Sequence, residues 1–295
     1  MLKKILVLGG TRFFGKRLVE QLLNEGHDVT IATRGNNDDS FGQSVTRIKV
    51  DRTDSTALKL ALGTSSFDVV YDNICYKPQD AEEAVKLFAD RVGQYILTSS
   101  GSVYTFGEQR LVESDFDPYH YALPPAYEQD IDYAEAKRLV EAVFMQKASF
   151  PVAAVRFPIV LGHDDYTRRL HFHIEHVQQE LPIGIPNLDA KMTYIRSDEA
   201  AALLAWLGQT DLKGPFNASS HGELSLREIL EMLTQETGKH PRITDEVNEK
   251  NSSPFGIPEP FMLDITKASA AGFSFMQLQE WFPKLVREIV HSSAK

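Results

Sequence analysis

The chain has 295 residues, of which 42% are hydrophobic and 24% are charged, values that are ordinary for a globular protein with a sizeable core. Its formal net charge of -10, from 31 basic and 41 acidic residues, argues against a protein whose main work is to grip nucleic-acid phosphates. A single cysteine, Cys75, excludes an intramolecular disulfide and favours a reducing compartment such as the cytoplasm; we expect it to be a small buried apolar residue.

Short apolar runs alternate with helical patterns along the first half of the chain. We expect strands at residues 4–8, 29–33, 45–50, 67–71 and 95–99, and helices at 13–25 and 81–89. The apolar run behind the basic start is too short for a signal peptide, and no window is long enough to span a membrane. The alternation predicts an α/β fold with a doubly wound parallel sheet, the Rossmann arrangement, and helices on both faces.

The second half of the chain is less regular. Residues 101–130 are rich in Pro, Gly, Tyr and Asp and predict a long loop, of a kind that is usually functional or mobile. A helix is expected at 131–146 and a sixth buried strand at 152–160, followed by helices at 198–207, 226–237 and 276–290. We therefore expect a Rossmann domain over residues 1–162 and a small substrate-binding lobe over 163–295 that is partly interwoven with the sheet.

A glycine-rich segment lies between the first strand and the first helix. Gly9 and Gly15 stand where a dinucleotide-binding turn needs glycines, because the backbone must turn tightly and approach a pyrophosphate. The helix that follows offers unpaired N–H groups to phosphates. Arg12 occupies the place of a middle glycine, and its guanidinium either contacts a phosphate or projects into solvent. The expected cofactor contacts are Gly9, Thr11, Arg12, Phe13, Phe14 and Gly15.

The end of the second strand favours NADP(H) over NAD(H). An NAD site usually carries an Asp or Glu about 20 residues after the glycines, whereas this chain has Thr33 and Arg34 there. A carboxylate would repel a 2′-phosphate and an arginine would attract it, although Arg34 could instead stack on adenine or face solvent. Asp51, at the end of the third strand, either accepts from the adenine amino group or caps a helix that starts near Ser55.

Tyr133 and Lys137 lie four residues apart at the start of a predicted helix and therefore share one face. A nearby ammonium stabilises a phenolate, so this pairing suits a tyrosine that exchanges a proton near neutral pH. Taken alone, the spacing is typical of a solvated helix pair. Here it follows a five-strand pattern, and Ser100 stands at the carboxyl end of the fifth strand, the edge where α/β folds bind ligands. We expect the three side chains to converge on one pocket.

Together these segments resemble the extended short-chain dehydrogenase/reductases, the NAD(P)-dependent epimerase/dehydratase group. The resemblance covers nearly the whole chain and rests on residues 9–15, 99–104, 156–162, 194–200, 216–218 and 225–228, and on the Tyr133–Lys137 pair with Glu141 after it. It implies that Tyr133 is the general acid/base, that Lys137 binds the nicotinamide ribose and that Ser100 holds the reacting oxygen. It adds four expected cofactor contacts: Arg52, Ser99, Phe157 and Pro158.

The resemblance implies an NADP(H)-dependent epimerase, dehydratase or reductase acting on a nucleotide sugar or a similar hydroxyl or carbonyl substrate. The form of residues 9–15 also resembles a subgroup that includes chloroplast stem-loop RNA-binding proteins, some of which have lost the tyrosine and lysine. The alternative is therefore a cofactor-binding protein without turnover, a redox sensor or an RNA-associated factor. The retained pair and the acidic charge favour an enzyme with no nucleic-acid or membrane partner, and a homodimer is left open.

Several polar residues in the expected substrate lobe are further candidates for substrate or metal binding, with less sequence support. Arg168 and Arg169 would suit the diphosphate of a sugar nucleotide, or form a solvated charged pair. Tyr194 is a third candidate for the substrate site. A group of histidines follows the sixth strand, but it lacks the matched carboxylates or cysteines of a metal centre, so we expect a polar helix there and no metal: His163, His171, His173 and His176.

Overall fold

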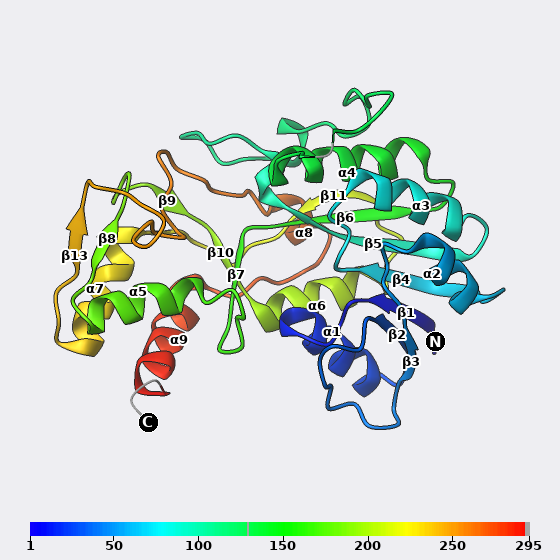
Figure 1. Cartoon of the computed structure of the whole chain (residues 1–295), viewed down its shortest axis with the longest axis horizontal. Helices are drawn as coiled ribbons and strands as arrows, with labels where there is room; N and C mark the ends of the chain where they lie inside the picture. The colour runs from blue at the N-terminus through cyan, green and yellow to red at the C-terminus, as the bar shows by residue number, and fades with distance from the viewer. Residues whose placement is uncertain (129, 293–295) are drawn as a thin grey trace.

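The computed structural model describes residues 1–128 and 130–292, and its centre is a seven-stranded sheet (Figure 1). Every strand pairs in parallel, in the order β11-β6-β5-β4-β1-β2-β3. This confirms the doubly wound Rossmann arrangement. The strand order reverses between β1 and β4, and ligands bind in the crevice outside the carboxyl ends at such a point. The strands are β1 (Lys4–Leu8), β2 (Asp28–Thr33), β3 (Thr46–Lys49), β4 (Phe67–Asp72), β5 (Val92–Ser100), β6 (Val152–Phe157) and β11 (Gly214–Asn217).

Helices cover both faces of this sheet (Figure 1). One face carries α1 (Phe13–Asn24) and α6 (Ser197–Leu207), and the other carries α2 (Ser55–Leu62), α3 (Pro78–Phe88) and α4 (Tyr133–Lys147). Successive strand residues point to opposite faces, so Val7 joins the core beneath α1 and Leu8 joins the core beneath α3. Cys75 is buried in the second of these cores, as expected.

A second lobe lies at the carboxyl ends of the strands, on the left of Figure 1. Its helices α5 (Arg169–Gln178), α7 (Leu226–Thr237) and α9 (Leu278–Ser292) enclose a third apolar core. Between its elements the chain returns to the sheet, where it contributes α6, β11 and the short α8 (Thr266–Ala270). The lobe also contains β8 (Pro182–Gly184), β9 (Lys191–Met192), β10 (Tyr194–Arg196), β12 (Leu224–Ser225) and β13 (Arg242–Thr244).

The apolar run expected as one sixth strand forms two strands. β6 ends at Phe157, and β7 (Ile159–Leu161) leaves the sheet to pair with β10. Pro158 stands between them, and proline has no N–H to donate to a strand ladder. The chain therefore turns out of the sheet at Pro158 and carries β7 into the second lobe.

The long segment after β5 is a loop, as expected, and it contains the short 3-10 turns η1 (Gly101–Val103) and η2 (Glu113–Asp115). It lies along α3 and α4 at the top of Figure 1. Tyr127 donates to Glu82 of α3, and Gln146 of α4 donates to the carbonyl of Pro118. Among the described residues, no helix is long and apolar enough to cross a bilayer.

Candidate active site

A cavity of about 770 Å³ lies where the carboxyl edge of the sheet meets the second lobe. The side chains expected to act together, Ser100, Tyr133 and Lys137, all line it. So do several of the expected cofactor contacts from the glycine turn, β5 and the end of β6: Phe13, Phe14, Ser99, Phe157 and Pro158. The second lobe closes the cavity with a largely apolar wall that includes Met192, Pro254, Ile257 and Phe261.

The ammonium of Lys137 is almost completely buried, with 1% of the residue exposed. Its Nζ donates to the carbonyl oxygens of Cys75 at 2.9 Å and Thr98 at 3.0 Å. An ammonium has three N–H donors, so two are fixed by carbonyls of the segment after β4 and of β5, and one is left for a ligand. Nζ also lies 4.8 Å from the ring centroid of Tyr76 and 5.9 Å from that of Tyr133.

Tyr133 opens α4, and more than half of the residue is exposed at the cavity. The helix starts at this point because the Asp132 carboxylate accepts from the backbone N–H of Glu135. The phenol is thus accessible while the ammonium one turn further along is fixed. Tyr76, which no sequence motif marks, contacts the same ammonium through its ring. Burial, followed by neighbouring tyrosines, raises the pKa of Tyr76 to about 12, so it stays a neutral phenol.

Ser100 closes β5 and turns the chain into η1. Its Oγ accepts from the backbone N–H of Ser102 at 3.1 Å. Ser102 also lines the cavity. Its Oγ is buried and has no hydrogen-bond partner within the described residues. Ser99 lines the cavity too, but its hydroxyl donates to Glu141 and so turns toward the interior. Ser100 and Ser102 are therefore the β5-end hydroxyls available to a ligand.

The glycine turn has the backbone that its sequence suggests, with one exception. Gly9 and Gly10 have φ angles of 89° and 107°, in the region that favours glycine. Arg12 is extended, with φ of -138° and ψ of 152°, so its position needs no glycine. The left-handed residue is instead Phe13, with φ of 52°, a conformation that costs a bulky side chain about 1–3 kcal/mol. Its buried ring, 6.2 Å from that of Tyr166, holds the turn in place.

An arginine follows each of the strands β2 and β3: Arg34 is exposed and Arg52 is buried. Arg34 is exposed, with no intramolecular hydrogen bond among the described residues, and the Oγ1 of Thr33 accepts from the N–H of Gly35. Arg52, expected to contact the cofactor, has a buried guanidinium that is paired with Asp72.

Asp51 does not cap α2. The capping residue is Asp54, whose carboxylate accepts from the N–H of Ala57 at 2.9 Å. Hydrogen bonds from the backbone and side chain of Thr53 lower the pKa of Asp51, and the charge of Arg34 adds a smaller contribution. Asp51 and Arg34 therefore lie close enough to interact at the carboxyl edge.

The three substrate candidates separate in space. Arg169 lines the cavity. Arg168 pairs with Glu175 on the surface and is not among the lining residues. Tyr194, the third candidate, has its ring buried in the third core between Phe255 and Phe282.

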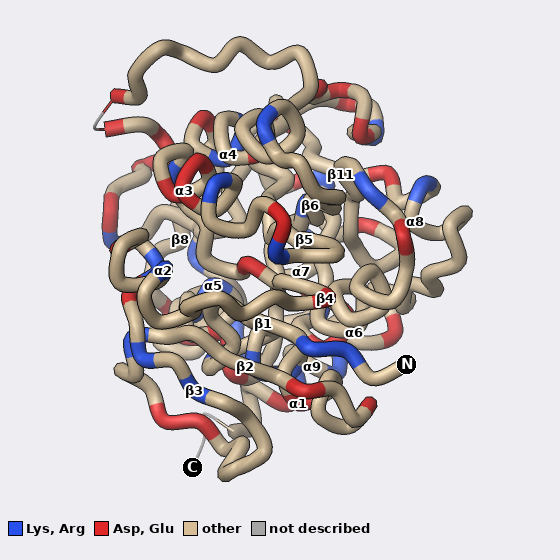
Figure 2. The backbone as a smooth tube through the Cα atoms, turned by 90° about the vertical axis from the view of Figure 1, so that its right-hand side faces the viewer, with Lys and Arg blue, Asp and Glu red and all other residues tan. Residues whose placement is uncertain are grey.

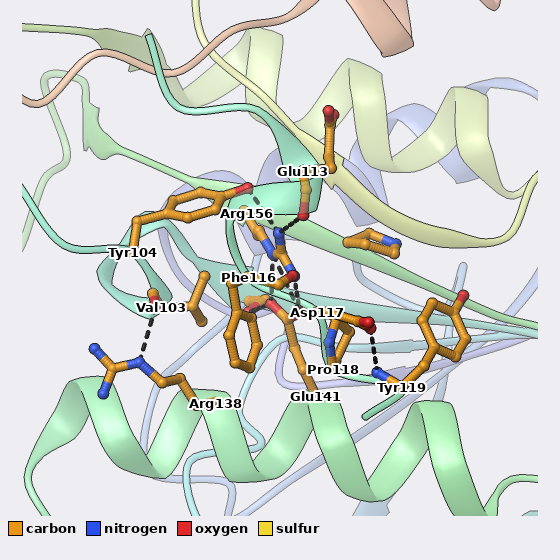
Figure 3. Close-up of polar contacts among 12 residues, drawn as sticks. Val103, Tyr104, Glu113, Phe116, Asp117, Pro118, Tyr119, Arg138, Glu141 and Arg156 are labelled. Carbon is orange, nitrogen blue, oxygen red and sulfur yellow. Dashed lines mark hydrogen bonds and ion pairs between the residues drawn. The ribbon is translucent and has the colours of Figure 1, made fainter. Parts of the chain in front are cut away.

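A buried ion pair positions α4 against the sheet (Figure 3). Arg156 of β6 and Glu141 of α4 are both fully buried, and Arg156 Nη2 lies 2.7 Å from Glu141 Oε2. Arg156 also donates to the Tyr104 hydroxyl and to the carbonyls of Glu113 and Phe116. Burial works to lower the pKa of Arg156, but the Glu141 carboxylate outweighs it and the pKa is raised. The pair therefore joins β6, α4 and the long loop beside the cavity.

Comparison with known proteins adds a family match to this geometry. The model of the NAD dependent epimerase/dehydratase family matches residues 5–218. Over 223 residues the chain is 28% identical to the chloroplast stem-loop binding protein of 41 kDa b from Arabidopsis thaliana. That match covers 70% of this chain and 55% of the plant protein, so the chain spans little more than half the length of this relative.

Two solved epimerases share the fold. The UDP-glucose 4-epimerase of Thermus thermophilus, in complex with NAD, is 18% identical with a TM-score of 0.70 and 97% coverage of both chains. The UDP-glucose 4-epimerase of Thermotoga maritima, with UDP-glucose, is 17% identical with a TM-score of 0.72 and 99% coverage of both chains.

Proposed function

Because the chain belongs to the NAD dependent epimerase/dehydratase family, we propose that it is an NADP(H)-dependent epimerase, dehydratase or reductase acting on a nucleotide sugar or a similar hydroxyl or carbonyl compound. The observation that carries this proposal is that Ser100, Tyr133 and Lys137 line one cavity at the carboxyl edge of the sheet. The NAD and UDP-glucose present in the two solved epimerases support a nicotinamide cofactor and a sugar-nucleotide substrate.

The residues divide the chemistry among them. A bound nicotinamide supplies the acceptor or donor of a hydride. Tyr133 takes the proton from the substrate hydroxyl through its phenol oxygen, or returns it to the carbonyl oxygen. Lys137, whose Nζ lies 5.9 Å from the ring centroid of Tyr133, offers its remaining N–H to a ribose hydroxyl. Ser100 donates to the same substrate oxygen and fixes its direction.

The glycine turn fits the cofactor that the family uses. Gly9 and Gly10 let the backbone approach a pyrophosphate closely, and α1 begins immediately behind them. The preference for NADP(H) rests on Arg34, an exposed cation that follows Thr33 at the end of β2, where an NAD site usually carries an Asp or Glu. Arg12, whose guanidinium lies 5.5 Å from the ring of Tyr166, is a second cation near the turn.

Arg169 is the proposed contact for a substrate phosphate. The other cations of the cavity wall have partners in the chain: Lys137 gives two of its three donors to carbonyls, and Arg138 contacts the carbonyl of Val103 at 2.8 Å and Glu135. No intramolecular hydrogen bond is found for the Arg169 side chain within the described residues. It is therefore free to bind an anionic group that enters between the lobes.

A substrate screen and one conservative substitution test this function. Purified protein is incubated with NADP(H) or NAD(H) and a panel of nucleotide sugars, and both nicotinamide absorbance and product without net redox are followed. Tyr133→Phe should reduce turnover by about a hundredfold or more while dinucleotide affinity is kept, since only the transferable proton is lost. Lys137→Ala should reduce both.

Tyr127→Phe is the matched control for this test, because Tyr127 lies on the long loop with its hydroxyl on Glu82 and does not line the cavity. Its activity should equal that of the wild type. Full activity in Tyr133→Phe would remove the proposed mechanism.

A second candidate function has one observation in its favour, the match to a plant protein whose name describes stem-loop binding. The net charge of -10 weighs against it, and acidic and basic residues are interspersed in the view of Figure 2. A gel-shift titration with a stem-loop RNA separates the two. Salt-sensitive RNA binding by a protein that turns over no substrate would favour the second candidate.

A further inference from the structure

Three cavity-lining residues carry a buried polar atom without a hydrogen-bond partner among the described residues: Asn73 Nδ2, Ser102 Oγ and Asp165 Oδ2. A buried donor or acceptor left unpaired costs about 1–3 kcal/mol, so such atoms at a binding site mark places where a ligand supplies the missing partner. Ser102 follows the β5 end and Asp165 lies on the second lobe. Asn73 alone lies at the glycine turn.

Asn73 follows the last residue of β4 and reaches the start of α1. Its backbone N–H donates to the carbonyl of Leu8, and its Oδ1 accepts from Thr98 Oγ1 at 2.8 Å. The Thr98 contact fixes the amide, so Nδ2 points the other way. A Cβ built on Gly15 would lie 3.3 Å from that nitrogen, which places the free amide against the turn in the first part of α1.

Asn73 is also connected to the proposed catalytic pair. The carbonyl of Thr98 accepts a hydrogen bond from the Lys137 ammonium, and the Thr98 hydroxyl donates one to Asn73. One strand end therefore fixes both the ammonium and the amide. With 8% of the residue exposed, Asn73 is held rigidly, and its two N–H donors meet no acceptor from the part of the chain that the structure describes.

We propose that Asn73 is a cofactor-binding residue whose side-chain amide donates to a phosphate oxygen of the dinucleotide at the N-terminus of α1. This inference rests on the proposed function. Two independent features select a phosphate: the start of a 12-residue helix attracts an anion, and the adjacent amide is an unpaired donor. Asn73 belongs to none of the sequence motifs, because it follows β4 and not the glycine segment.

Asn73→Asp tests this inference with little change in shape. A carboxylate oxygen can still accept from Thr98, while the other replaces the N–H donors by negative charge and repels a phosphate. We expect affinity for NADP+ and for ADP-ribose, measured by calorimetry, to fall at least about tenfold, the loss that 1.4 kcal/mol produces. Adenosine, which has no phosphate, should bind both proteins equally. Asn73→Ala should weaken ADP-ribose less than Asn73→Asp, since it removes the donor without adding charge.

Asn248→Asp is the matched control, because it adds the same charge at an exposed position of the second lobe, outside the cavity. It should leave every affinity unchanged. Thermal unfolding of the ligand-free proteins reports whether Asn73→Asp folds. If it does not, the affinities of two other variants are measured instead: Asn73→Ala, and Thr98→Val, which frees the Asn73 amide to rotate. Wild-type affinity for ADP-ribose in the Asn73 variants would overturn this inference alone. A wild-type protein that binds no dinucleotide would overturn the proposed function with it.

Discussion

At the end of β2, the side chain of Arg34 decides the proposed cofactor preference. Arg34→Ala should weaken NADP(H) binding about tenfold or more, because a charge-assisted hydrogen bond to the 2′-phosphate contributes about 1.5–3 kcal/mol. NAD(H) has a neutral hydroxyl in place of that phosphate, so its affinity should change by less than about twofold. Calorimetric titration with both nucleotides measures the difference.

Arg47→Ala on the neighbouring strand β3 removes an exposed arginine that is paired with Asp39, and it serves as the charge-matched control. Its affinities should match those of the wild type. An Arg34→Ala protein that loses NAD(H) and NADP(H) affinity in equal measure would assign Arg34 to the adenine and contradict the preference.

The sequence predicts an individual cavity residue only where a motif marks that residue. The glycine segment and the Tyr133–Lys137 spacing have local signatures, so their place on the cavity was accessible from sequence. Tyr76 and Asn73 have none; the available signal was that both follow a buried strand at the carboxyl edge. Arg52 occupies the same edge and points inward, because the Asp72 that pairs with it is near only in the folded chain.

At the scale of elements, the buried pair of Arg156 and Glu141 joins β6 to α4. Glu141→Gln should lower the free energy of unfolding by about 3–5 kcal/mol, because it leaves the fully buried guanidinium without its countercharge. Denaturant unfolding at neutral pH measures the loss. Since α4 also carries the proposed acid/base, surviving protein should show reduced turnover.

Asp189→Asn is the control for this element, because it removes one carboxylate from an exposed pair with Arg227. Exposed ion pairs add little stability, so this variant should unfold near the wild-type denaturant concentration. Equal stability of the two variants would show that the buried pair does not hold α4 in place.

Elements with a clear period were predictable, and those that depend on the tertiary setting were not. The first five strands follow their apolar runs. β11 was missed because Gly214 and Pro215 argue against a strand, yet β11 is an edge strand, where a proline is tolerated. A polar helix was expected among the histidines after Gly162, and α5 is a helix there. Its apolar face was missed because the histidines obscure it, and only the third core reveals it: Leu170, Ile174 and Val177.

At the scale of the whole molecule, buried hydrogen bonds connect the two lobes where chain segments pass from one to the other. Glu199 of α6, on the sheet side, accepts from the hydroxyl of Ser220 and the backbone N–H of Met276, which leads into α9. Trp281 of α9 donates to the same Ser220 at 2.9 Å. Because this polar cluster is buried, the second lobe is expected to unfold together with the sheet, so a change in the lobe is measurable in the stability of the whole chain.

His173 is the group in the second lobe whose titration should appear in that global stability. Its ring is fully buried, with Nδ1 2.9 Å from the carbonyl of Arg169 and Nε2 2.8 Å from the hydroxyl of Ser253. A neutral imidazole satisfies both partners, one nitrogen donating and the other accepting. Burial lowers the pKa of His173 to about 4, whereas an unfolded chain binds the proton near a pKa of about 6.5.

The sign of the pH dependence follows from that difference. Between about pH 6.5 and about pH 4 the unfolded chain binds the proton and the folded chain does not, so the contribution of His173 to stability is complete above this window and is lost as the pH falls through it. At about pH 5 the loss amounts to about 2 kcal/mol. Denaturant unfolding at about pH 7.5 and about pH 5 should show this loss in the wild type.

His173→Gln, whose amide can still donate to Arg169 and accept from Ser253, should lose about 2 kcal/mol less of its unfolding free energy over the same pH interval. His176→Gln, on the same helix, should keep the wild-type dependence, and a His173→Gln protein with an unaltered pH dependence would show that the buried imidazole is not its source.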